Sequence, residues 1–105
     1  MAMTVMNKFA ASEDVIDPLL DELAAHRAVL AKQPGFVNGA VYKQVGGPGR
    51  FNVVNVAHWE SPEAFEAARK VLADAYAEKG STPVARYGEL GVEADHGAYA
   101  ELVSY

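Results

Sequence analysis

The stretch "NVAHWESPEAF", Asn55–Phe65, combines the end of a strand with the start of a helix. Side chains alternate in character up to Trp59, as on a strand that is buried on one face. Ser61 is then a typical N-cap, and Pro62 is tolerated in the first helical turn. The junction therefore predicts a strand that ends near residue 59 and a helix that begins near residue 62.

Working outward from this junction, the sequence predicts four strands and two long helices. The expected strands cover residues 4–10 ("TVMNKFA"), 36–45 ("FVNGAVYKQV"), 50–59 ("RFNVVNVAHW") and 98–105 ("AYAELVSY"). The first helix begins in "ASEDVIDP", residues 11–18, and ends at "QPGF", residues 33–36, while the second ends near Gly80. Residues 46–49 ("GGPG") form a turn between two strands. Residues 81–97 are expected to be less regular, with a short helical turn from Pro83.

The predicted element order, β-α-β-β-α-β, is typical of a ferredoxin-like α+β fold. This fold class has a four-stranded antiparallel sheet with both helices on one face. On the third strand, the uncovered face would carry Asn52, Val54, Val56 and His58. A partly apolar face of this kind is most simply buried against a second copy of the chain. We therefore expect a homodimer built through the open sheet face.

Length and composition limit the classes of function. A chain of 105 residues, half of them apolar, is expected to form one domain, residues 1–105. The net charge is −5 and the nine basic residues are scattered, so nucleic acid is not an expected partner. There are no cysteines, which excludes disulfides and thiolate metal ligands. Residues 1–11 do not read as a signal or transit peptide, and no apolar run approaches the roughly 20 residues of a membrane span. A soluble, cytoplasmic protein with no membrane partner is expected.

Four stretches of the sequence resemble the antibiotic biosynthesis monooxygenase family of dimeric α+β barrels. They are "VMNKF" (5–9), "KQPGF" (32–36), "NVAHWESPEAF" (55–65) and "HGAYAELV" (96–103). The block W-E-S-x-E-A-F is the most specific of them. The resemblance implies a ferredoxin-like fold, sheets that pair face to face in a homodimer, and a substrate cavity within each protomer, between the helices and the sheet.

The family that these stretches resemble is diverse in function. Some members oxidise phenolic polyketides to quinones with oxygen and no cofactor. Others degrade haem, isomerise small metabolites or have no known activity. Because fold alone does not choose among these activities, the choice depends on individual residues.

Asn55 and Trp59 are the candidate catalytic residues. Both are expected on the helix-facing side of the third strand, roughly 13 Å apart along the backbone, which is enough to flank a flat polycyclic ligand. A buried amide without a partner costs about 1–3 kcal/mol, so Asn55 needs either a ligand oxygen or a neighbouring backbone group. The quinone-forming members have an Asn and a Trp at this spacing that line the cavity. The resemblance therefore implies the same for Asn55 and Trp59.

Five further residues are candidates for binding a small-molecule substrate. Phe65, Leu72 and Tyr76 follow one face of the second helix and are expected to form an apolar wall. Arg69 lies at the edge of this stripe, where it can either reach an anionic substrate or lay its stem over the core with its head in water. Asn7, on the first strand, either lines the same cavity or pairs locally.

The chain also departs from the pattern that the resemblance implies. Phe65 takes the place of a tyrosine in the quinone-forming members and cannot carry a proton. Their arginine near the end of the second helix has no clear counterpart, Lys79 being nearest in position. The haem-degrading branch has a Trp and an axial His on the second helix, and residues 62–79 contain neither.

No metal site and no bound cofactor are predicted. His26, His58 and His96 are too dispersed for metal-ligand spacing. Alternation also places His58 on the open face of the sheet, away from the side chain of Trp59. We therefore expect neither haem, flavin nor metal in the protein.

Two interpretations of the function remain open. The favoured one is a cofactor-independent monooxygenase that oxidises a small aromatic, phenolic or enolisable substrate with O2, with Asn55 and Trp59 as donors to the developing oxyanion. The other is a non-catalytic dimeric module that binds a small metabolite, or a metabolite isomerase of the same fold. A cavity of about 300 Å³ or more at Asn55 and Trp59 favours the first. A closed core with Asn55 paired to backbone favours the second.

Overall fold

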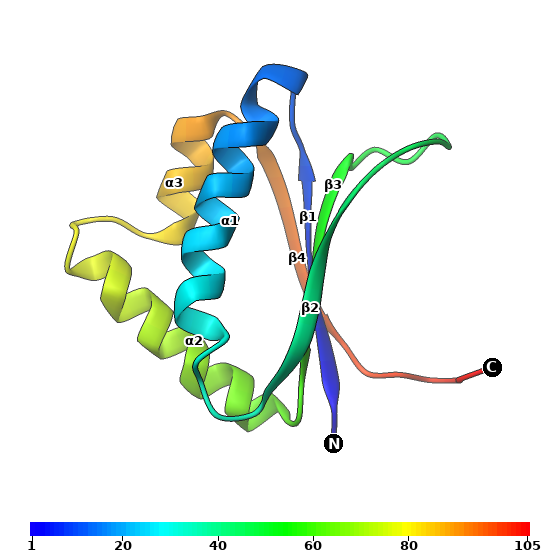
Figure 1. The fold of residues 1–105 in the computed structure, drawn as a ribbon, viewed down its shortest axis with the longest axis vertical. Helices are drawn as coiled ribbons and strands as arrows, with labels where there is room; N and C mark the ends of the chain where they lie inside the picture. Colours follow the sequence, from blue (N-terminus) through cyan, green and yellow to red (C-terminus); the bar gives the residue numbers. More distant parts are fainter.

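A four-stranded antiparallel sheet carries three α-helices on one of its faces (Figure 1). The computed structural model describes residues 1–105. The strands are β1 (Met3–Ala10), β2 (Phe36–Lys43), β3 (Val53–Trp59) and β4 (Glu93–Tyr99), in the spatial order β2-β3-β1-β4. The helices are the 3₁₀ turn η1 (Glu13–Val15) and the α-helices α1 (Ile16–Leu30), α2 (Pro62–Ala77) and α3 (Pro83–Leu90). The predicted ferredoxin-like α+β fold is confirmed.

The segment after α2 differs from the sequence prediction. Residues 83–90 form a complete helix, and the fourth strand is Glu93–Tyr99 instead of residues 98–105. The Thr82 hydroxyl caps α3 by accepting a hydrogen bond from the backbone N–H of Ala85, and Gly91 ends the helix at a φ of 73°. β4 is an edge strand of mostly exposed residues, so it lacks the apolar alternation by which a strand is found in sequence.

The junction from β3 to α2 forms as the sequence predicts. The Ser61 hydroxyl accepts a hydrogen bond from the backbone N–H of Ala64 at 3.1 Å, and Pro62 is the first residue of the helix. The turn before β2 packs closely against this first helical turn. A Cβ added to Gly35 would lie 2.4 Å from the Cβ of Ala64, and the φ of 90° at Gly35 also favours glycine. The close packing of this turn on the start of α2 therefore requires glycine at position 35.

The strand register determines which side chains face the helices. Asn7 lies opposite Asn55 in the β1–β3 ladder and opposite His96 in the β1–β4 ladder. Because directly opposed side chains share a face of the sheet, these three residues form one polar row. The core lies in two clusters: Phe9, Ile16, Leu19, Leu23, Val53, Tyr87 and Val92 in one, and Met3, Val5, Trp59 and Ala68 in the other. The members that belong to β1 and β3 lie on the same sheet face as the polar row.

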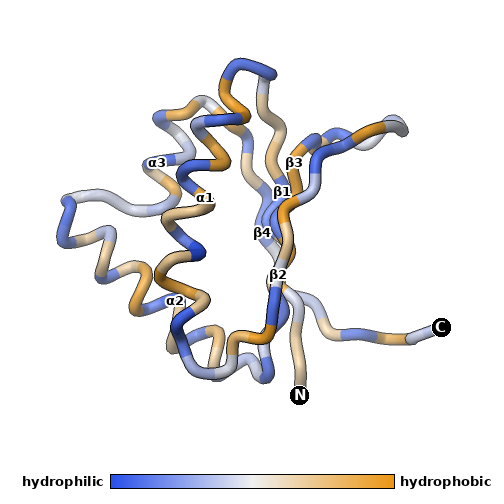
Figure 2. Tube along the Cα trace, viewed as in Figure 1, coloured by the Kyte–Doolittle hydropathy of each residue, from blue (hydrophilic) through white to orange (hydrophobic).

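Both long helices are amphipathic, and apolar and polar segments alternate along them in Figure 2. Leu19 and Leu23 of α1 and Leu72 of α2 are buried, while Arg27 and Lys70 stay exposed. This is the expected pattern for helices that cover one face of a sheet.

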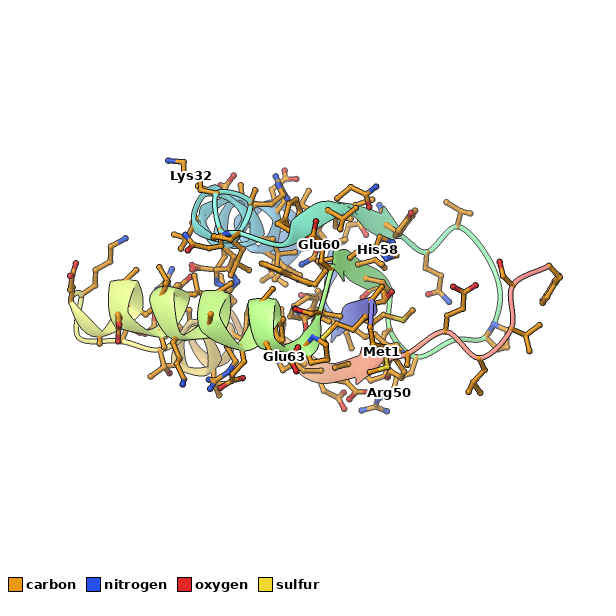
Figure 3. The ribbon with its side chains drawn as sticks, turned by 90° about the horizontal axis from the view of Figure 1, so that it is seen from below. Met1, Lys32, Arg50, His58, Glu60 and Glu63 are labelled. Carbon is orange, nitrogen blue, oxygen red and sulfur yellow. The ribbon has the colours of Figure 1, made fainter.

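The other face of the sheet has no helix over it (Figure 1). Val54 and Val56 of β3 lie on this face together with His58, which is exposed. The loop between β2 and β3 and the segment after β4 both extend beyond this face (Figures 1 and 3). That C-terminal segment carries exposed apolar side chains at Leu102 and Val103. None of the helices combines the length and the apolar character needed to cross a bilayer.

Candidate functional site

A cavity of about 450 Å³ lies between the sheet and the helices. All four strands and all three α-helices contribute to its wall, and most of the lining residues are apolar. A few polar side chains in an otherwise apolar wall are typical of small-molecule sites, which usually exceed about 300 Å³. The cavity is therefore large enough for an aromatic ligand.

Three polar side chains from neighbouring strands form the floor of this cavity: Asn55 of β3, Asn7 of β1 and His96 of β4. We call them the polar floor. Nδ1 of His96 lies 2.9 Å from Oδ1 of Asn7, and the imidazole donates because an amide oxygen only accepts. Burial lowers the pKa of His96, which leaves the ring neutral near pH 7. The Asn55 side chain hydrogen-bonds no other protein group, so its amide is available to a ligand.

The helices supply both apolar and charged groups to the cavity. Phe65, Leu72 and Arg69 line it from α2, and Arg27 lines it from α1. The exposed Arg69 guanidinium is paired with Glu66, with Nε of Arg69 3.0 Å from Oε2 of Glu66. Since both arginines are exposed and also line the cavity, they place positive charge at its rim. Such a rim attracts anionic ligands.

Trp59 is buried beside the cavity but is not one of its lining residues. Its side chain is 1% exposed, and the rings of Phe36 and Phe65 pack against it at centroid distances of 5.3 and 5.7 Å. Those two rings do line the cavity. The indole Nε1 is buried without a hydrogen-bond partner. The structure therefore places Trp59 behind the wall, with one unused donor, and its catalytic role stays a prediction.

The helical spacing predicted that Tyr76 lines the same cavity as Phe65 and Leu72. In the structure Tyr76 does not line that cavity. It lines a second hollow of about 520 Å³ together with Lys79 and Arg86. Its hydroxyl donates a hydrogen bond to Glu22. The predicted stripe therefore leaves the cavity after Leu72, because the next turn of α2 faces α1 and α3 at Glu22 and Arg86.

His26 and Tyr87 also line the cavity, and neither is among the site residues predicted from the sequence. The Tyr87 hydroxyl lies 3.1 Å from Nδ1 of His26, and Nε2 of His26 lies 3.6 Å from Oε2 of Glu22. The spacing of Glu22 and His26, four residues apart on one helix, was an available signal for this pair. Tyr87 carries no such signal, because its partner His26 lies 61 positions away along the sequence.

Burial and hydrogen bonding set the charges of these three groups. Burial lowers the pKa of His26 below its ordinary value of 6.5, so the imidazole is neutral at about pH 7. Burial raises the pKa of Tyr87, which keeps its hydroxyl protonated. Burial alone would raise the pKa of Glu22, but hydrogen bonds from Tyr76 and Arg86 outweigh it and the pKa is lowered. Glu22 is therefore a carboxylate.

The described residues contain no group of three or more His, Cys, Asp or Glu side chains placed to hold a metal ion. The polar side chains of the cavity are instead amides, imidazoles, guanidiniums and one phenol. These groups bind organic ligands through hydrogen bonds and charge.

The fold is similar to those of several solved structures. A candidate monooxygenase from Shewanella loihica PV-4 matches with a TM-score of 0.77 and 21% sequence identity over 98% of this chain and 96% of that one. A variant of SnoaB, a cofactor-independent oxygenase from Streptomyces nogalater, matches at 0.67 and 21% over 98% and 95%. A haem-degrading protein from Mycobacterium tuberculosis matches at 0.66 and 19% over 100% and 99%. At these identities the likeness shows a shared fold.

A search of curated protein sequences gave no match to the chain. The family model for antibiotic biosynthesis monooxygenases matches residues 2–72, which is more than half of the chain. The matched part includes Asn7, Asn55 and Phe65 of the cavity. The chain therefore belongs to the antibiotic biosynthesis monooxygenase family.

Proposed function

We propose that this protein is a cofactor-independent monooxygenase that oxidises a small aromatic, phenolic or enolisable substrate with O2 above the polar floor. The observation that carries the proposal is the Asn55 amide, which lines an apolar cavity and has no protein partner. The fold shared with SnoaB, a cofactor-independent oxygenase, supports this class of reaction.

In this reaction the substrate itself supplies the electrons that reduce O2. For a phenol with a free para carbon, the O–H bond and the para C–H bond both break. One oxygen atom of O2 becomes the new carbonyl of a quinone, and the other leaves as water with the two hydrogens. The protein needs to favour the phenolate, exclude bulk water and admit O2.

The cavity offers groups for each of these tasks. Asn55 is placed to donate to the substrate oxyanion, and fixed donors in a dry cavity stabilise such charge without reorganising. Arg27 and Arg69 attract the anion to the rim, while Phe65 and Leu72 exclude water.

Trp59 remains the proposed second donor to the oxyanion. Its indole N–H has no other partner, but Trp59 itself does not line the cavity, so a ligand would reach it only after a neighbouring side chain moves. Asn55 differs from Trp59 in this respect, since Asn55 lines the cavity directly and needs no movement of a neighbour to reach a ligand.

Haem, flavin and metal have no part in the proposed mechanism. The resemblance assigns an axial His of the haem-degrading members to the second helix, but Pro62–Ala77 contains no His. The residues of α2 therefore do not fit a haem held in that way. We expect the absorbance spectrum of the purified protein to lack a Soret or flavin band. A band at near-stoichiometric occupancy would contradict this part of the proposal.

We also propose that the protein is a cytoplasmic homodimer formed through the open sheet face. Val54 and Val56 lie on this face without a helix over them. A second copy would bury them and would also cover the exposed apolar side chains of the C-terminal segment, such as Leu102.

The function is tested by oxygen uptake with alpha-naphthol and anthrone, two simple aromatic substrates of the proposed class. Wild type should consume O2 and form the quinone, and Asn55→Ala should do so far more slowly. Asn38→Ala is a matched control, because Asn38 is an exposed asparagine that pairs with His58 on the open sheet face. Binding of these compounds without any oxygen uptake would instead support a metabolite-binding module.

A further inference from the structure

A series of polar side chains leads from the cavity into the space between the helices. Tyr87 on α3 and His26 on α1 both line the cavity and are only 4% and 5% exposed. The Tyr87 hydroxyl lies 3.1 Å from Nδ1 of His26, and Nε2 of His26 lies 3.6 Å from Oε2 of Glu22. The other oxygen of Glu22 accepts a hydrogen bond from Nε of Arg86 at 3.0 Å. The series therefore begins at the cavity and ends at the carboxylate of Glu22, which Arg86 fixes by a hydrogen bond.

The proton positions along this series follow from the chemistry of its members. The Glu22 carboxylate favours the tautomer of His26 that carries its proton on Nε2. Nδ1 is then bare and accepts the hydrogen bond that the Tyr87 hydroxyl donates. The 3.6 Å between Nε2 and the carboxylate is too long for a hydrogen bond, so Nε2 is buried without a hydrogen-bond partner, but it is within ion-pair distance once the ring is charged. The ring is therefore set to accept a proton at Nδ1.

We propose that Tyr87, His26 and Glu22 form a proton relay that takes the hydroxyl proton of a phenolic ligand bound in the cavity. The inference rests on the proposed function for its ligand class and deepens it, because it names the proton acceptor of the reaction. Tyr87 touches the ligand, His26 keeps the proton, and Glu22 is a positioning residue that stabilises the imidazolium.

The transfer balances in protons and electrons. The O–H bond of the ligand breaks as its proton bonds to the Tyr87 oxygen, and the original Tyr87 proton moves to Nδ1 of His26. Tyr87 ends in its starting state, the ligand becomes a phenolate, and His26 becomes an imidazolium paired with Glu22. The polar floor then holds the phenolate, and no electron has moved.

The surroundings of His26 favour a reversible acceptor. The titratable and charged groups around it are Glu22 and Arg27 of α1, Arg69 and Tyr76 of α2, Arg86 and Tyr87 of α3, and His96 of β4. Burial lowers the pKa of His26, Glu22 raises it in part, and His96 lowers it further. The ring is therefore uncharged before the ligand binds, and Glu22 offsets the cost of charging it.

His96 is the other imidazole on the cavity wall and the alternative acceptor. Its Nδ1 is committed to Asn7, which leaves Nε2 as its acceptor atom. Asp95 raises the pKa of His96 from beyond ion-pair distance, whereas the Glu22 carboxylate lies 3.6 Å from Nε2 of His26. His96 is exposed, whereas His26 is only 5% exposed and has the counter-charge that a buried imidazolium needs. His26 is therefore the proposed acceptor that keeps the proton away from bulk water, and the test includes both residues.

The relay is tested with para-nitrophenol, whose phenolate is yellow, without any turnover. Phenolate formation on binding is read from absorbance, and proton release into a weakly buffered solution near neutral pH is measured in parallel. A relay keeps the ligand proton on His26, so wild type should form phenolate with little proton release. In His26→Gln and Tyr87→Phe, any phenolate that forms should be matched by an equal amount of released protons. Tyr87→Phe keeps the ring that packs on Phe9, so its fold should persist.

Two controls match the substituted residue types. His58→Gln and Tyr105→Phe change exposed residues outside the cavity and should retain the proton as wild type does. Full proton release by wild type, unchanged retention in His26→Gln, or loss of retention only in His96→Gln would overturn the relay. Failure of wild type to bind the probe would also overturn it. Normal retention without any oxygen uptake on alpha-naphthol would leave the relay standing and reject the oxygenase function.

A further measurement needs no variant of the relay. Nitrogen NMR of labelled imidazoles should show His26 as the Nε2–H tautomer in the free protein, with Nδ1 becoming protonated when para-nitrophenol binds. An Nδ1–H tautomer in the free protein would contradict the relay.

Turnover gives a separate test with variants. Removing a general base typically costs 10²-fold or more in rate, so His26→Gln should lose at least roughly that factor. Glu22→Gln should move the acid limb of the rate profile to lower pH, because Glu22 raises the pKa of His26.

Discussion

Asn7 and Asn55 lie directly opposite each other in the ladder of β1 and β3, and both line the same cavity. They are not equivalent, because Asn7 is hydrogen-bonded to His96 and Asn55 has no protein partner. An amide that lines a mostly apolar cavity without a protein partner has its donors and acceptor free for a ligand. The pair therefore marks the place where a polar group of the ligand is expected.

Asn55→Ala should reduce turnover by roughly 10²–10³-fold, the usual effect of losing one oxyanion donor. Folding should be nearly unchanged, since the side chain makes no hydrogen bond within the protein. Melting temperature and oxygen uptake are measured on wild type, Asn55→Ala and the control Asn38→Ala. A much lower melting temperature with normal turnover of the folded fraction would show that the amide is structural.

Trp59→Phe should cost about 1 kcal/mol of stability, the central value for single substitutions. The loss is limited because the indole N–H that disappears has no partner, and a ring remains between Phe36 and Phe65. The activity loss should be milder than in Asn55→Ala. Urea unfolding and initial rates measure the two effects, and an unchanged rate would show that the indole N–H does not donate to the substrate oxyanion.

Val54→Asp should convert the proposed dimer into monomers, because it buries an unpaired charge in the interface. Light scattering at micromolar concentration measures the mass. Val71→Asp is the matched control, since Val71 is 42% exposed on α2, on the helical side of the molecule. A wild-type monomer, or a dimer that only Val71→Asp disrupts, would reject the open sheet face as the interface.

Stability should fall on acidification through the groups whose pKa the fold lowers. Burial lowers the pKa of His26 and of His96 below 6.5, and the hydrogen bonds of Glu22 lower its pKa against the effect of burial. In each case the unfolded chain binds protons more readily than the folded one. The stabilisation is therefore complete above the unfolded-state pKa and is lost as pH falls through the folded-state pKa.

The measurement is the free energy of unfolding in urea at about pH 7 and about pH 5, a window that spans the ordinary pKa of histidine. Wild type should be less stable at the lower pH, and His26→Gln should show a smaller difference. An equal difference in both proteins would contradict a buried, neutral His26.

Much of the fold could be predicted from the sequence because its signals are local. Ser61 and Pro62 mark the start of α2, and the alternation around Asn55 marks β3 and its two faces. Alternation also places Asn7 and Asn55 toward the helices, where the register brings them together. These features depend on neighbours along the chain, which a single sequence displays directly.

The rest of the cavity depends on contacts that join distant residues. Tyr87 meets His26 across 61 positions of sequence, and His96 meets Asn7 across 89. Tyr76 leaves the wall because Glu22 of another helix holds its hydroxyl. The edge strand β4 is mostly exposed and α3 has only eight residues, so neither gave a signal strong enough to place its residues in the cavity beforehand.

The helix α3 is held at its ends by a Thr82 cap and a Gly91 stop, and its Pro83 and Val84 reach the cavity. Residues 83–90 lie outside the part of the chain that matches the family model, residues 2–72. Replacing Pro83 or Val84 with a bulkier or smaller residue should therefore change the shape of the cavity without altering a sheet pairing. In this architecture, the first turn of α3 sets part of the shape of the cavity independently of the sheet, which supplies the amides of Asn7 and Asn55.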